Sequence, residues 1–130
     1  MSNFNMFQTM KQAIMIITDD IIFPNLFHIL LQRMMPDLKI DICESCEEID
    51  NSIDSENYKL IILDGKLSKT SPIQIVQHIR VMNSAKMPIW FFIPEILMKS
   101  YIDKLYEMGA SRMITKPFDP YIITSEIVLV

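Results

Sequence analysis

Short apolar segments alternate strictly with longer helical patterns along the chain, and this alternation restricts the possible folds more than any other feature. The predicted strands span residues 13–17, 38–43, 59–63, 88–93 and 112–115, which are rich in β-branched and aromatic side chains. The predicted helices span 24–35, 44–55, 71–82, 95–108 and the segment from 119 to the C-terminus. Alternating strands and helices predict a parallel sheet with helices on both faces, because right-handed crossovers place them there. For five strands we expect the order 2-1-3-4-5.

The composition predicts one domain and excludes several classes of function. We expect a loose tail at 1–11 and a single domain over 12–130 of the 130 residues. A net charge of −4 disfavours a nucleic-acid surface, and two glycines are too few for a glycine-rich phosphate loop. No uncharged apolar run is long enough to cross a membrane, and the N-terminus does not resemble a secretion signal. We therefore expect a cytoplasmic protein.

Charged side chains follow three of the predicted strands, at the edge where ligands bind in such sheets. Asp19 and Asp20 follow the first strand, Asp64 follows the third, and Lys116 follows the fifth. Because strands 1 and 3 are predicted neighbours, the three carboxylates should converge, and two of them 4 Å apart repel by roughly 4 kcal/mol at an effective dielectric of 20. Such a cluster requires a proton, a lysine or a cation. Mg²⁺ or another hard divalent cation suits carboxylate oxygens.

These segments resemble the receiver domain of two-component response regulators over about residues 12–128. The resemblance rests on IMIITDD, LIILDG, PIWFFIP and GASRMITKPF, which occur in the order and at the spacing of that family. It implies a flavodoxin-like (CheY-like) fold, a three-layer α/β/α sandwich. It also implies a signalling module rather than an enzyme. The implied partners are a histidine kinase or histidine phosphotransfer protein, and a downstream protein or output domain, with no nucleic acid or membrane contacted by this chain itself.

The resemblance implies a role for each matching residue. Asp64 matches the phosphoacceptor, which takes a phosphoryl group from a phosphohistidine. Asp19 and Asp20 match the metal-binding pair, completed by Asp64 and the backbone carbonyl of Lys66. Lys116 matches the lysine that contacts the phosphoryl oxygens, and the bond from Lys116 to Pro117 is expected to be cis.

Two positions depart from the family. Receivers usually carry Ser or Thr at the end of the fourth strand. Counting residues from Pro88 puts Ile93 at that position in this chain, and counting from Asp64 or Lys116 puts Pro94 there. They also tend to carry an aromatic residue three positions before the lysine, where this chain has Met113. Losing one hydrogen bond to a phosphoryl group costs on the order of 1.5–3 kcal/mol. We therefore expect an atypical output switch, and a degenerate receiver that binds partners without phosphate is the first alternative.

Two further alternatives come from individual residues. The Lys66 ammonium could enter the acidic pocket and partly replace the metal. Cys43 and Cys46 form a C-x-x-C motif at the start of a predicted helix, which is compatible with a thiol–disulfide protein.

Overall fold

The computed structural model describes residues 12–53, 58–67, 70–82, 87–93 and 98–130. These residues form a five-stranded parallel sheet and five helices. The strands are β1 (Ala13–Ile17), β2 (Lys39–Cys43), β3 (Tyr58–Asp64), β4 (Ile89–Ile93) and β5 (Arg112–Thr115). The helices are α2 (Ile22–Met34), α3 (Cys46–Ile53), α4 (Pro72–Met82), α5 (Lys99–Glu107) and α6 (Pro120–Val128). The strand order is β2-β1-β3-β4-β5 with parallel pairing throughout, which confirms the predicted sheet.

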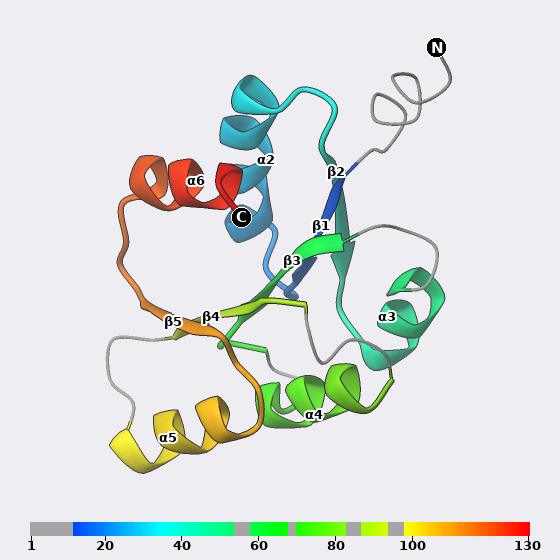
Figure 1. Cartoon of the computed structure of the whole chain (residues 1–130), viewed down its shortest axis with the longest axis vertical. Helices are drawn as coiled ribbons and strands as arrows, with labels where there is room; N and C mark the ends of the chain where they lie inside the picture. The colour runs from blue at the N-terminus through cyan, green and yellow to red at the C-terminus, as the bar shows by residue number, and fades with distance from the viewer. Residues whose placement is uncertain (1–11, 54–57, 68–69, 83–86, 94–97) are drawn as a thin grey trace.

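The helices cover both faces of the sheet and complete three layers (Figure 1). Helices α2 and α6 pack on one face, and α3, α4 and α5 pack on the other. Successive residues of the central strands face opposite layers, so both layers bury apolar side chains of β1 and β3. Ile62 faces the α2/α6 layer and Leu63 the opposite layer, with neither side chain exposed. This alternation fixes which layer the next residue, Asp64, faces.

Two helix ends illustrate how the sequence determines local structure. Helix α2 starts at Ile22, two residues before the predicted start at Pro24, which is therefore the third helical residue. Proline is tolerated in the first turn because those backbone N–H groups have no partner within the helix. At the end of α5, Gly109 adopts a φ of 116°, as expected for a glycine that ends a helix.

Several predictions reach beyond the described residues. The tail at 1–11 lies outside them, as do the end of the helix predicted at 44–55 and the start of the one predicted at 95–108. In the part of the chain that is described, no helix combines the length and apolar character that a membrane span requires.

Candidate functional site

Asp64 ends β3 at the carboxyl edge of the sheet and is buried, with 1% of its surface exposed. The pairing of Ile17 with Leu63 places Thr18 beside Asp64, and Asp64 pairs with Phe92 of β4. Because neighbouring residues in a parallel pair face the same layer, Thr18, Asp64 and Phe92 all face α2 and α6. The sheet register therefore brings a hydroxyl group to the buried carboxylate.

Three donors hold the Asp64 carboxylate. The Lys116 ammonium (Nζ) donates to Oδ1 at 2.7 Å, and the backbone N–H of Lys66 donates to the same oxygen at 3.1 Å. The Thr18 hydroxyl donates to Oδ2 at 2.8 Å. An ion pair with Lys116 and two hydrogen bonds from uncharged donors offset the cost of burying this carboxylate, which would otherwise be large.

Lys116 reaches Asp64 from the first position after β5. Its backbone N–H donates to the carbonyl of Ile93 at 2.9 Å, which continues the β4–β5 ladder by one residue. Its ammonium lies 4.5 Å from the centre of the Phe23 ring, a cation–π contact. The Lys116–Pro117 bond is cis, as the resemblance implied.

An aromatic cluster surrounds the ring that contacts this lysine. It consists of Phe23, Phe27, Phe92 and Phe118, with ring centres 4.9–6.4 Å apart. Most of these pairs meet edge to face, the arrangement that the quadrupoles of the rings favour. Within this cluster Phe23 contacts the Lys116 ammonium, and the other three rings pack around Phe23.

The acidic pair lies in the segment between β1 and α2. Asp19 is half-buried and Asp20 is exposed. The Asp20 carboxylate accepts a hydrogen bond from the backbone N–H of Ile22 at 3.1 Å, close to the start of α2. Among the residues that the structure describes, no three His, Cys, Asp or Glu side chains gather closely enough to hold a metal ion. The predicted convergence of Asp19, Asp20 and Asp64 on one metal site is therefore not found among these residues, and their metal role stays a prediction.

Lys66 contributes its backbone rather than its charge. Its side chain is exposed, while its N–H donates to Asp64 as described above. The cation that pairs with the buried carboxylate is Lys116, which argues against the hypothesis that the Lys66 ammonium fills the pocket.

Of the three positions that depart from the family pattern, Ile93 and Met113 lie among the described residues. Ile93 ends β4 and is 4% exposed, so an apolar side chain occupies that position. Pro94 lies outside the described residues. Met113 is half-buried in β5, and its backbone N–H donates to the hydroxyl of Tyr106 in α5 at 3.2 Å.

The two cysteines are poorly suited to redox chemistry. Both are free thiols. Burial raises the pKa of the Cys43 thiol to about 11 and also raises the pKa of Cys46. Reactive cysteines need a lowered pKa, because the thiolate is the nucleophile. The environment of these thiols therefore argues against a thiol–disulfide protein.

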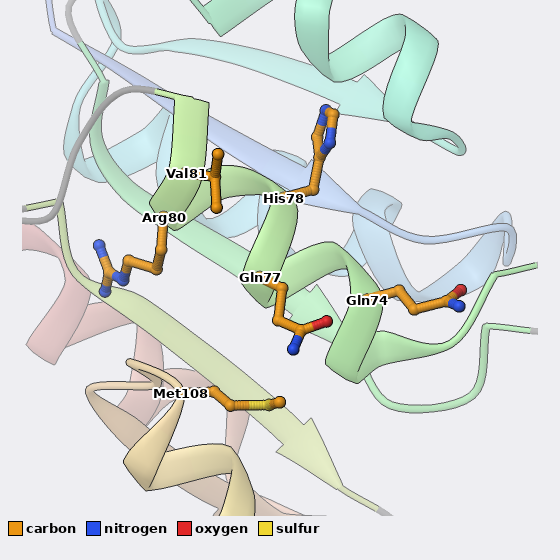
Figure 2. A pocket seen from close by; sticks show the side chains of 6 residues that line it. All are labelled: Gln74, Gln77, His78, Arg80, Val81 and Met108. Atoms are coloured by element: carbon orange, nitrogen blue, oxygen red, sulfur yellow. The ribbon is translucent and has the colours of Figure 1, made fainter.

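A separate groove lies between α4 and the end of α5 (Figure 2). Its lining comprises Gln74, Gln77, His78, Arg80, Val81 and Met108. Arg80 donates through Nη1 to the Met87 carbonyl at 2.8 Å and through Nε and Nη2 to the Gly109 carbonyl, so it joins α4 to the turn before β5. None of the predicted site residues lines this groove.

Sequence reasoning missed Thr18 and Phe23. The signal for Thr18 was available, because it follows a strand predicted to neighbour the one that ends at Asp64. Phe23 offered no such signal, since its contact with Lys116 depends on how α2 packs over the sheet.

The comparisons with known proteins agree with this fold. The response regulator receiver domain family matches residues 14–128. A signal receiver domain from Colwellia psychrerythraea 34H has a TM-score of 0.77 at 19% identity, covering 90% of this chain and 95% of that one. Chemotaxis protein CheY4 from Vibrio cholerae has a TM-score of 0.77 at 16% identity, covering 94% and 99%. A two-component response regulator from Clostridium difficile has a TM-score of 0.72 at 23% identity, covering 92% and 93%.

No curated protein matches the sequence. The three structures are less than 25% identical to the chain, so by themselves they establish the CheY-like flavodoxin fold. The family match spans all five strands, from within β1 to the end of α6. The chain therefore belongs to the response regulator receiver domain family.

Proposed function

We propose that Asp64 accepts a phosphoryl group from a phosphohistidine of a histidine kinase or histidine phosphotransfer protein. The observation that carries this proposal is the buried Asp64 carboxylate and its ion pair with Lys116, whose nitrogen and oxygen lie 2.7 Å apart at the carboxyl edge of the sheet. Receiver domains of response regulators interact with histidine kinases and output domains, so family membership supports the choice of donor.

The transfer is a displacement at phosphorus. An Asp64 carboxylate oxygen forms the new P–O bond, the P–N bond of the phosphohistidine breaks, and the electron pair of that bond leaves with the imidazole. The product is an acyl phosphate on Asp64. Lys116 balances the negative charge on the transferred oxygens, and the fixed donors of Thr18 and the Lys66 backbone hold the carboxylate in place.

We infer that a divalent cation such as Mg²⁺ assists this step. The candidate ligands are the side chains of Asp19, Asp20 and Asp64 and the backbone carbonyl of Lys66, an all-oxygen set that suits a hard cation. Among the described hydrogen bonds, Asp64 Oδ2 accepts one and Oδ1 two, so Oδ2 keeps a lone pair for a ligand bond. Oδ1 can attack phosphorus when Lys116 transfers its hydrogen bond from Oδ1 to the transferred oxygens. When bound, the cation would supply positive charge to the reacting oxygens.

Intact mass spectrometry tests the proposal directly. Incubation with a small phosphodonor and Mg²⁺ should add the mass of one phosphate, and Asp64→Asn should abolish this gain. Asp103→Asn is the matched control, because Asp103 is an exposed aspartate of α5 and should leave the gain unchanged. A chelator should suppress the gain if the cation is required. Absence of any gain with all donors, or a gain that persists in Asp64→Asn, would refute the proposal.

A degenerate receiver that works without phosphate is the second candidate. The feature that favours it is the end of β4, where the family usually supplies a hydroxyl and this chain has Ile93 or Pro94, neither of which carries one. We also infer that the output switch is atypical, because Met113 replaces the usual aromatic residue of β5. A protein that gains no phosphate yet binds its partner would support this second candidate.

A further inference from the structure

We propose that Thr18 is a positioning residue for phosphoryl transfer, because its buried hydroxyl fixes the orientation of the Asp64 carboxylate. This inference rests on the proposed role of Asp64 as phosphoacceptor. Thr18 is 1% exposed, and its hydroxyl oxygen lies 2.8 Å from Asp64 Oδ2. The hydroxyl therefore acts on the reacting group from a water-poor environment, where a hydrogen bond is electrostatically stronger than in water.

The hydroxyl proton is directed at Asp64 by a second hydrogen bond. The backbone N–H of Asp20 donates to the Thr18 oxygen at 3.0 Å. A hydroxyl has one proton and two lone pairs, so accepting from Asp20 leaves its proton for the carboxylate. Asp20 lies in the segment that leads into α2, so Thr18 connects this segment to the phosphoacceptor.

The geometry of the carboxylate explains why this bond affects transfer. Lys116 and the backbone N–H of Lys66 both donate to Asp64 Oδ1 and so hold one end of the carboxylate. Thr18 holds the other end, so that rotation of the carboxylate about its Cβ–Cγ bond breaks at least one of the three bonds. A carboxylate already turned toward the incoming phosphorus avoids the entropy cost of orienting it in the transition state.

Three variants test this role. Thr18→Val keeps the shape of the side chain and removes the hydroxyl, whereas Thr18→Ser keeps the hydroxyl and removes a methyl group. Thr124→Val is the matched control, since Thr124 is equally buried and its hydroxyl donates to the Pro120 carbonyl of α6 rather than to the site. The rate at which each folded protein gains one phosphate from a small phosphodonor with Mg²⁺ is followed by intact mass. Amide hydrogen exchange of Asp20 reports on its bond to residue 18.

We expect Thr18→Val to slow phosphate gain about tenfold. Thr18→Ser should stay within about twofold of the natural protein, because it keeps the fixed donor, as should Thr124→Val. The Asp20 amide should exchange faster in Thr18→Val and stay protected in Thr18→Ser. If Thr18→Val does not fold, Thr18→Ala replaces it, with the same expected loss.

The outcomes separate this inference from the proposed function. If the natural protein gains no phosphate, the phosphoacceptor role fails, and the role of Thr18 fails with it. If the natural protein is phosphorylated and the variant without the hydroxyl reacts at the same rate, the positioning role alone is overturned. Equal slowing by Thr18→Val and Thr18→Ser would also overturn it, since the effect would then come from packing rather than from the hydroxyl.

Discussion

Replacing Lys116 with methionine tests whether the pair with Asp64 governs stability as well as chemistry. At 2.7 Å and an effective dielectric of 20, the gross attraction of the pair is about 6 kcal/mol, much of which is offset by desolvation. Removing one partner of a buried ion pair costs about 3–5 kcal/mol, because the other charge is left uncompensated. Here the Lys116 side chain is 20% exposed, so water can partly replace it. Asp64 also keeps the hydroxyl of Thr18 and the N–H of Lys66. We therefore expect a loss of about 2–3 kcal/mol.

Urea unfolding followed by circular dichroism measures this loss. For a domain of this size, 2–3 kcal/mol corresponds to a fall in melting temperature of about 10 °C. Lys66→Met is the matched control, since Lys66 neighbours Asp64 in sequence but its side chain is exposed, and it should change stability by less than about 0.5 kcal/mol. In an Asp64→Asn background, Lys116→Met should cost much less, because no buried charge is left unpaired. A Lys116→Met protein as stable as the natural one, or an equal loss in Lys66→Met, would refute the assigned ion pair.

Three further predictions address other parts of the chain. Gly65→Ala should cost about 3 kcal/mol in urea unfolding, because a Cβ there would lie 2.6 Å from the Phe92 carbonyl oxygen, and unchanged stability would contradict this close approach. Arg80→Met should cost about 2 kcal/mol by the same measurement, because the Gly109 carbonyl loses its charged donor, and a change below half that value would be inconsistent with the role assigned to Arg80. The raised pKa of Cys43, about 11, leaves roughly one thiol in a thousand ionised at pH 8, so labelling with a chromogenic disulfide reagent should be slow there and accelerate as pH rises toward 11. Labelling of Cys43 at pH 8 as fast as in the unfolded chain would contradict the raised pKa.

The sheet and the position of Lys116 at the same edge as Asp64 could be predicted because both depend on topology. Strict alternation of strands and helices determines a parallel sheet, and its strand order places the ends of β1, β3 and β5 at one edge. The strand order alone then assigns a residue directly after a strand to the carboxyl edge of the sheet, independently of how the following loop folds. The first residue of a helix follows less directly from the sequence, as Pro24 shows. A proline is compatible with any position in the first turn, so it restricts the start of α2 to a few residues.

The orientation of the acidic pair could not be predicted in the same way, because Asp19 and Asp20 follow the last paired residue of β1. Beyond the ladder, no register fixes the side chain, and local hydrogen bonds decide where it points. Asp20 uses its carboxylate to accept from Ile22 and its backbone N–H to donate to Thr18. Both interactions depend on the turn into α2 rather than on the sheet. The part of the pocket that the sheet defines is therefore a hydroxyl, a carboxylate and an ammonium, contributed by Thr18, Asp64 and Lys116. A cation bound to Asp64 would have to take its remaining side-chain ligands from the turn into α2.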